Sequence, residues 1–105
     1  MDAKTRARLQ VRAKIMKAMA HPARLLIVEE LAQGERSVGE LTEIVGADVS
    51  TVSKHLALLR NAGIVSDDKR GAKVFYSLRV RCALNFFSCV EDVVKSRAKQ
   101  IKLVS

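Results

Sequence analysis

Aromatic residues are scarce in this 105-residue sequence, which has three Phe, one Tyr and no Trp. We therefore expect a core made mainly of Leu, Val, Ile and Ala, as in helix-rich domains. No apolar run approaches the roughly 20 residues that a membrane-spanning helix needs. The N-terminal stretch MDAKTRARLQVRAKIMKAMA has no signal-peptide hydrophobic segment. These absences predict a cytoplasmic protein with no membrane partner.

Cysteine is also rare, and the side-chain sets that enzymes use are missing. The two cysteines, Cys82 and Cys89, give no reason to expect a structural disulfide in a reducing compartment. The sequence shows no paired carboxylates, no nucleophile with a neighbouring base and no Gly-rich phosphate loop. An enzymatic function is therefore not expected.

Positive charge is what the sequence has in excess. Nineteen Lys and Arg residues against eleven Asp and Glu leave a formal charge of +8. In a chain long enough for only one compact domain, this imbalance predicts a polyanionic partner. Hydrophobic residues make up 49% of the chain, which is enough to pack a core and argues against disorder.

Helical patterns open the chain. Residues 4–20 read as a basic amphipathic helix, and Pro22 suits the first turn of a second helix that Gly34 ends. Ser37 and Glu40 have the spacing of a capping box for a short third helix. The inward-facing positions expected in the second and third helices are Leu25, Leu26, Val28, Leu31, Val38, Leu41, Ile44 and Val45.

A fourth helix begins at Asp48, a good cap, and ends at about Gly63. Two short helices joined at Gly46 predict a helix-turn-helix over about residues 37–62. The second helix of such a motif needs one apolar side and, opposite, small polar and basic side chains that enter the major groove. The apolar set here is Val52, Leu56 and Leu59, and the candidate DNA-binding set is Ser50, Thr51, Ser53, Lys54 and His55.

The alternative interpretation is that these polar residues are the solvated face of a surface helix. Short polar residues crowded into one turn are poor helix formers, which argues against that alternative. The segment that follows also favours DNA binding. Two β-rich runs, 64–66 and 74–78, flank a charged turn and predict a hairpin, or wing, over about residues 64–78. The candidate phosphate-binding residues near its tip are Lys69, Arg70 and Lys73.

The stretch SVGELTEIVGADVSTVSKHLALLRNAGIVSDDKRGAKVFYSL resembles the winged helix-turn-helix of the ArsR/SmtB family of bacterial repressors. The preceding MAHPARLLIVEEL resembles that family's entry into its second helix, so the resemblance covers about residues 16–78. It implies a mainly α fold with a small β-hairpin, in one DNA-binding domain over residues 1–105. It also implies a homodimer formed by the first and last helices, at about residues 4–20 and 81–99.

The resemblance further implies a sequence-specific transcriptional repressor on double-stranded DNA. Two recognition helices would enter successive major grooves, about 34 Å apart, on a partly palindromic operator. Where many relatives have Gln or a similar long polar residue, this chain has Val49, which offers an apolar contact to a thymine methyl instead. A nonspecific or architectural DNA-binding protein is the alternative, and a winged helix that serves only protein interaction is a third hypothesis.

Family members are typically released from DNA by a metal, a metalloid or thiol oxidation. The usual metalloid site starts the third helix, and the matching SVGELTEIV contains no cysteine. The positions that match the zinc-type site are Val80, Cys82, Val93 and Ser96. One thiol does not make a tetrahedral site, so neither site is predicted. No cofactor is expected unless cysteines bind arsenite or a soft metal ion.

Three interpretations of Cys82 and Cys89 stay open. Within one helix the two residues lie about 10.5 Å apart along the axis, too far to form a disulfide or hold one ion together. In the first interpretation they form an apolar stripe of the dimer interface with Phe86 and Val93. In the second, Cys82, beside Arg79 and Arg81, is a redox or persulfide switch. In the third, they belong to an arsenite or soft-metal site completed by thiols of both subunits.

Overall fold

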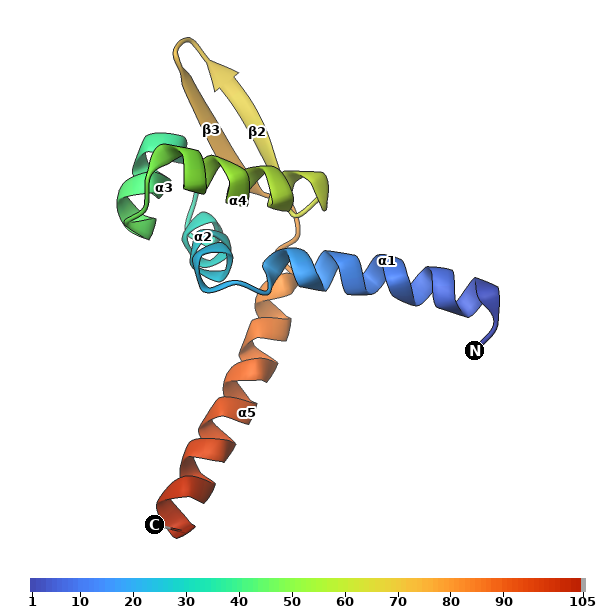
Figure 1. The fold of residues 1–105 in the computed structure, drawn as a ribbon. Coiled ribbons are helices and arrows are strands. Elements are labelled where there is room, and N and C mark those ends of the chain that lie inside the picture. Colours follow the sequence, from blue (N-terminus) through green and yellow to red (C-terminus); the bar gives the residue numbers. More distant parts are fainter. Residues whose placement is uncertain (105) are drawn as a thin grey trace.

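The fold is mainly helical with one small sheet, and it is seen in a computed structural model that describes the backbone of residues 1–104 and the side chains of residues 1–99. Ser105, the last residue of the predicted domain, lies outside the described residues. The elements in chain order (Figure 1) are α1 (Ala3–Met19), α2 (Pro22–Ala32), β1 (Arg36–Ser37), α3 (Val38–Val45), α4 (Val49–Asn61), β2 (Val65–Arg70), β3 (Lys73–Leu78) and α5 (Ala83–Val104).

The predicted helix boundaries around the helix-turn-helix are confirmed by their caps. The Glu40 N–H donates to Ser37 Oγ at 3.1 Å, and the Ser37 N–H donates to Glu40 Oε1 at 3.0 Å, which completes the capping box of α3. Gly46 ends α3 in the left-handed conformation, with φ 75°. Asp48 Oδ1 then accepts a hydrogen bond from the Thr51 N–H at 2.8 Å and starts α4.

The hydrophobic core lies where α2, α3 and α4 pack against one another and against the sheet. Its largest fully buried side chains are Ile27, Val28, Leu31, Leu41, Val52, Leu56, Leu59, Ile64 and Val65. Two predicted core positions are wrong, because Leu25 is 37% exposed and Ile44 is 38% exposed. Leu25 lies on the side of α2 that lines an open apolar groove together with Phe86 of α5.

The sheet is larger than the predicted hairpin. Its strand order is β1-β3-β2, all antiparallel, with Arg36 of β1 opposite Tyr76 of β3. β1 has two residues, too few to show an alternating pattern in the sequence. β2 also extends beyond the predicted residues 64–66 to Arg70, since its charged second half pairs with β3 through the backbone.

The first and last helices project from the core in different directions (Figure 1). Met19 is the one buried residue of α1, and the apolar side chains of both helices are largely exposed in the single chain. α5 begins at Ala83 rather than near residue 81, so Cys82 lies in the turn before the helix. Among the described residues, no helix is long and apolar enough to cross a membrane.

Candidate nucleic-acid interface

The N-terminal half of α4 has the two-sided character that the sequence predicts. Val52, Leu56 and Leu59 have no exposed surface and fix the helix to the core. The other side is exposed and carries the predicted residues Ser50, Thr51, Ser53 and Lys54. Hydrogen bonding from Thr51 lowers the pKa of Asp48, so the capping carboxylate stays ionised and holds the first turn. The exposed side chains are therefore presented on an anchored helix.

Val49 stands at the start of the same face. Its side chain is 58% exposed, although valine is apolar and the other exposed residues of the first turn, Ser50 and Thr51, are polar. This exposure leaves Val49 available for a contact to a thymine methyl group, which stays a prediction.

The wing places Lys69, Arg70 and Lys73 next to its turn. Arg70 lies opposite Lys73, and Gly71, with φ 62°, begins the two-residue turn between them. All three cationic side chains are exposed. Among the described residues, Lys69 and Lys73 take part in no salt bridge, so their ammonium groups are available to phosphates.

Arg70 is held within the protein. Its two terminal nitrogens donate to the Glu35 carboxylate at 2.6 and 2.7 Å, and its Nε donates to Asp68 at 2.9 Å. Its guanidinium also lies 4.8 Å from the centre of the Phe75 ring. Hydrogen bonds to Glu35 and then Asp68 raise the pKa of Arg70. The pairing ties the wing to the loop before β1.

His55 packs toward α2, unlike the rest of its predicted set. Its ring centre lies 4.5 Å from that of His21, and its Nδ1 is buried without a hydrogen-bond partner among the described residues. His21 caps α2, because its Nδ1 accepts from the Ala23 N–H at 3.1 Å. Burial, and then the neighbouring His21 and Arg24, lower the pKa of His55. A neutral ring at neutral pH is a poor partner for a phosphate.

The two cysteines lie away from α4 and the wing. Both are exposed in the single chain, as are Phe86 and Val93 of the predicted apolar stripe. Cys82 borders an apolar groove between α1 and α5. Among the described residues, no group of three or more His, Cys, Asp or Glu side chains is placed to hold a metal ion.

Comparison with known proteins decides the family. A family model described as "Bacterial regulatory protein, arsR family" matches residues 21–67. A biofilm growth-associated repressor of Xylella fastidiosa is 34% identical over 88 residues, which cover 84% of this chain and 77% of that protein. The chain belongs to the ArsR family. This ArsR-family chain is a DNA-binding transcriptional regulator, and the predictions of that class and of a non-enzymatic function are confirmed.

Solved structures agree with the winged helix-turn-helix fold of this ArsR-family chain. NolR from Sinorhizobium fredii matches with a TM-score of 0.80 at 28% identity, over 89% of this chain and 93% of that chain. Mb0332 from Mycobacterium bovis, described as a homodimeric winged helix-turn-helix DNA-binding domain, matches with a TM-score of 0.78 at 28% identity, over 95% of this chain and 93% of that chain.

Proposed function

We propose that this ArsR-family chain is a homodimeric repressor that recognises a partly palindromic operator. The observation that carries the proposal is the exposed polar face of α4, whose opposite face is fully buried. Base edges in the major groove are read by short polar and basic side chains on such a helix. Ser50, Thr51, Ser53 and Lys54 contact bases and phosphates, and Val49 contributes an apolar contact.

The wing adds phosphate contacts beside the groove. Lys69 and Lys73 supply them directly, because neither is paired among the described residues. Arg70 reaches a phosphate only by exchanging Glu35 for it, so its main effect is to hold the wing in position. His55 supports DNA binding indirectly, because it packs α4 against the N-terminus of α2.

Dimer formation buries the apolar faces that α1 and α5 expose. The exposed large apolar residues on these faces include Leu9, Met16, Phe86, Val90, Val93 and Val94. A monomeric protein rarely exposes so many apolar side chains on two neighbouring helices. The homodimeric description of the Mycobacterium bovis relative supports the same assembly. Two subunits then present two recognition helices to the two halves of an operator.

A nonspecific DNA-binding protein is the alternative, favoured by the formal charge of +8. Competition separates the two functions. The operator is first selected from random duplexes. The protein should then bind this operator at least about 10³ times more tightly than it binds random DNA, as measured by competition. A smaller ratio would mean that charge, rather than base reading, holds the protein on DNA.

Replacing Lys54 with Ala is expected to lower operator affinity about tenfold, because one charged contact to the DNA is lost. If that contact is to a phosphate, the slope of log affinity against log salt should also become shallower by about 0.9. Fluorescence anisotropy across a salt series measures both quantities. Lys95→Ala removes an equal charge from exposed α5 and should change affinity less than twofold. Equal losses in the two variants would contradict the assignment of Lys54.

Release by a thiol-reactive signal is proposed through Cys82, with Cys89 as the second candidate thiol. Both side chains are exposed, and Arg79 and Arg81 flank Cys82. Arsenite or an inorganic polysulfide is expected to release the wild-type protein from its operator, and Cys82→Ser should prevent release. If the wild type and Cys82→Ser/Cys89→Ser respond alike in anisotropy, the two thiols only pack the interface.

A further inference from the structure

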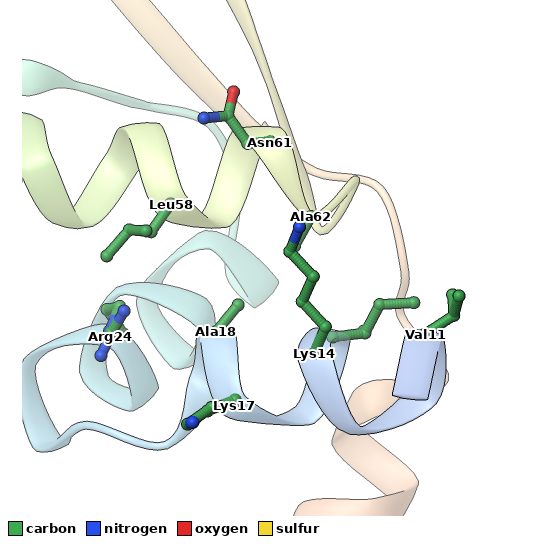
Figure 2. Close-up of a pocket in the computed structure, with 9 residues that line it drawn as sticks. Val11, Lys14, Lys17, Ala18, Arg24, Leu58, Asn61 and Ala62 are labelled. Atoms are coloured by element: carbon green, nitrogen blue, oxygen red, sulfur yellow. The ribbon is translucent and has the colours of Figure 1, made fainter. Parts of the chain in front are cut away.

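A pocket of about 770 Å³ opens between α1, α2 and the C-terminal half of α4. It shares no residue with the proposed DNA-reading set or with the thiols. Figure 2 shows Lys14 rising from α1 toward Ala62 at the end of α4, with Leu58 coming from α4 and Arg24 from α2. The volume falls within the roughly 300–1,000 Å³ typical of small-molecule sites.

The charged side chains that line the pocket are all cationic, and Asn61 is its one neutral polar residue among those described. Lys14 and Lys17 of α1 and Arg24 of α2 line it, and none of the described lining residues is acidic. Among the described residues, these three cations make no salt bridge. Three positive charges around one concave surface create a local potential that attracts an anion.

Arg24 brings a partly buried positive charge to the edge of the pocket. Its Nε is buried and has no hydrogen-bond acceptor among the described residues. Because this Nε is enclosed by the protein, a ligand in the pocket would pair with the terminal nitrogens of the guanidinium, for which a carboxylate is a well-matched acceptor. The positive charge of Arg24 also lowers the pKa of the nearby His55, as a smaller cause after burial and the charge of His21.

Apart from Asn61, the rest of the lining is apolar, which makes inorganic phosphate a poor fit to the pocket. Val11 is 61% exposed and Leu58 is 48% exposed, so both offer apolar surface to a bound molecule, together with Ile15. From these features we propose that the pocket binds an amphipathic organic carboxylate, with its anionic group at Lys14, Lys17 and Arg24 and its apolar body against Leu58. Such a ligand would touch both α1 and the recognition helix.

This proposal goes beyond DNA binding, and it is tested on the free protein. The ligand proposal and the operator proposal can therefore each fail without the other. The full-length ¹⁵N-labelled protein is titrated with 2-naphthoate and, separately, with the uncharged 2-naphthamide. The carboxylate is expected to shift amide signals of residues around Lys14, Arg24 and Leu58, and to bind at least about tenfold more tightly than the amide, as one charge-assisted hydrogen bond predicts.

Charge-matched variants locate the site. Lys14→Gln/Lys17→Gln should weaken 2-naphthoate binding about tenfold. Arg6→Gln/Arg8→Gln removes two charges from the same helix outside the pocket. It should change the affinity for 2-naphthoate less than twofold. All four side chains are exposed, so both double variants should keep the wild-type amide spectrum.

Several results would overturn the proposal. Equal affinity for the carboxylate and the amide would show an apolar groove without anion selectivity. Equal losses in the two double variants would show attraction to net charge only. Pocket signals that move with protein concentration, but not with 2-naphthoate, would show that a second copy fills the pocket. A loss of operator affinity in Lys14→Gln/Lys17→Gln, without naphthoate binding to the wild type, would make the pocket part of the DNA surface.

Discussion

Replacing Phe86 with Glu is expected to give a folded monomer whose operator affinity is lower by at least about 10⁴. The Phe86 side chain is 50% exposed in the single chain, and it lines both apolar grooves between α1 and α5. In the proposed dimer the partner subunit covers it. A carboxylate at this position would be buried without a counter-charge, which costs several kcal/mol and prevents association.

The size of the expected loss follows from the two half-sites. Specific complexes of this kind have dissociation constants of about 10⁻⁸ to 10⁻¹¹ M. A monomer engages one half-site and retains about half of the binding free energy, which corresponds to a loss of at least about 10⁴ in affinity. Light scattering after gel filtration measures the mass, and anisotropy measures the affinity.

Ser88→Glu is the matched control for Phe86→Glu. Ser88 lies two residues further along α5, on the opposite side of the helix by the 3.6-residue repeat, and it is exposed. The same charge there should leave both the mass and the affinity unchanged. A Phe86→Glu protein that remains dimeric and binds the operator would contradict the proposed interface, because the dimer would then use another surface.

Leu56→Ala is expected to lower the free energy of unfolding by about 2–5 kcal/mol, a large part of the stability of a small domain. Leu56 has no exposed surface and joins α4 to the core formed with α2, α3 and the sheet. Truncation leaves a cavity that close-packed neighbours such as Ile27 and Leu59 fill only in part. Operator binding should be lost under any conditions in which the variant is unfolded.

Leu58→Ala is the control, since it removes the same atoms from the same helix. Leu58 is 48% exposed, so its replacement should cost less than about 1.5 kcal/mol. Urea unfolding at one fixed protein concentration measures both variants, because dimer formation makes stability depend on concentration. Similar losses for the two substitutions would mean that α4 is not anchored through Leu56.

Local sequence was sufficient for the elements whose signals lie within a few residues of one another. The capping box at Ser37 and Glu40, the Asp48 cap and the left-handed Gly46 each depend on neighbours in the chain. The division of α4 into apolar and polar faces follows from helical spacing alone. For the same reason the exposed set Ser50, Thr51, Ser53 and Lys54 was predictable, and its contact with DNA remains a prediction.

The apolar faces of α1 and α5 could be predicted from helical spacing only in part. Helical spacing predicted that both helices have an apolar side, but it did not say what covers that side. In the single chain nothing described covers Phe86 or Val93 fully, since both keep at least half of their surface exposed. The partner subunit is therefore inferred from the combination of exposure and family membership.

Long-range contacts decided the features that local patterns missed. Glu35 and Arg70 are 35 residues apart, and they pair because β1 and the hairpin join one sheet. His55 packs on His21 because α4 crosses the start of α2, whereas helical spacing alone placed it with the DNA-facing residues. The cationic pocket needs three helices at once. Cap and face signals are local in the chain, but an ion pair, a ring contact or a pocket exists only once distant segments pack together.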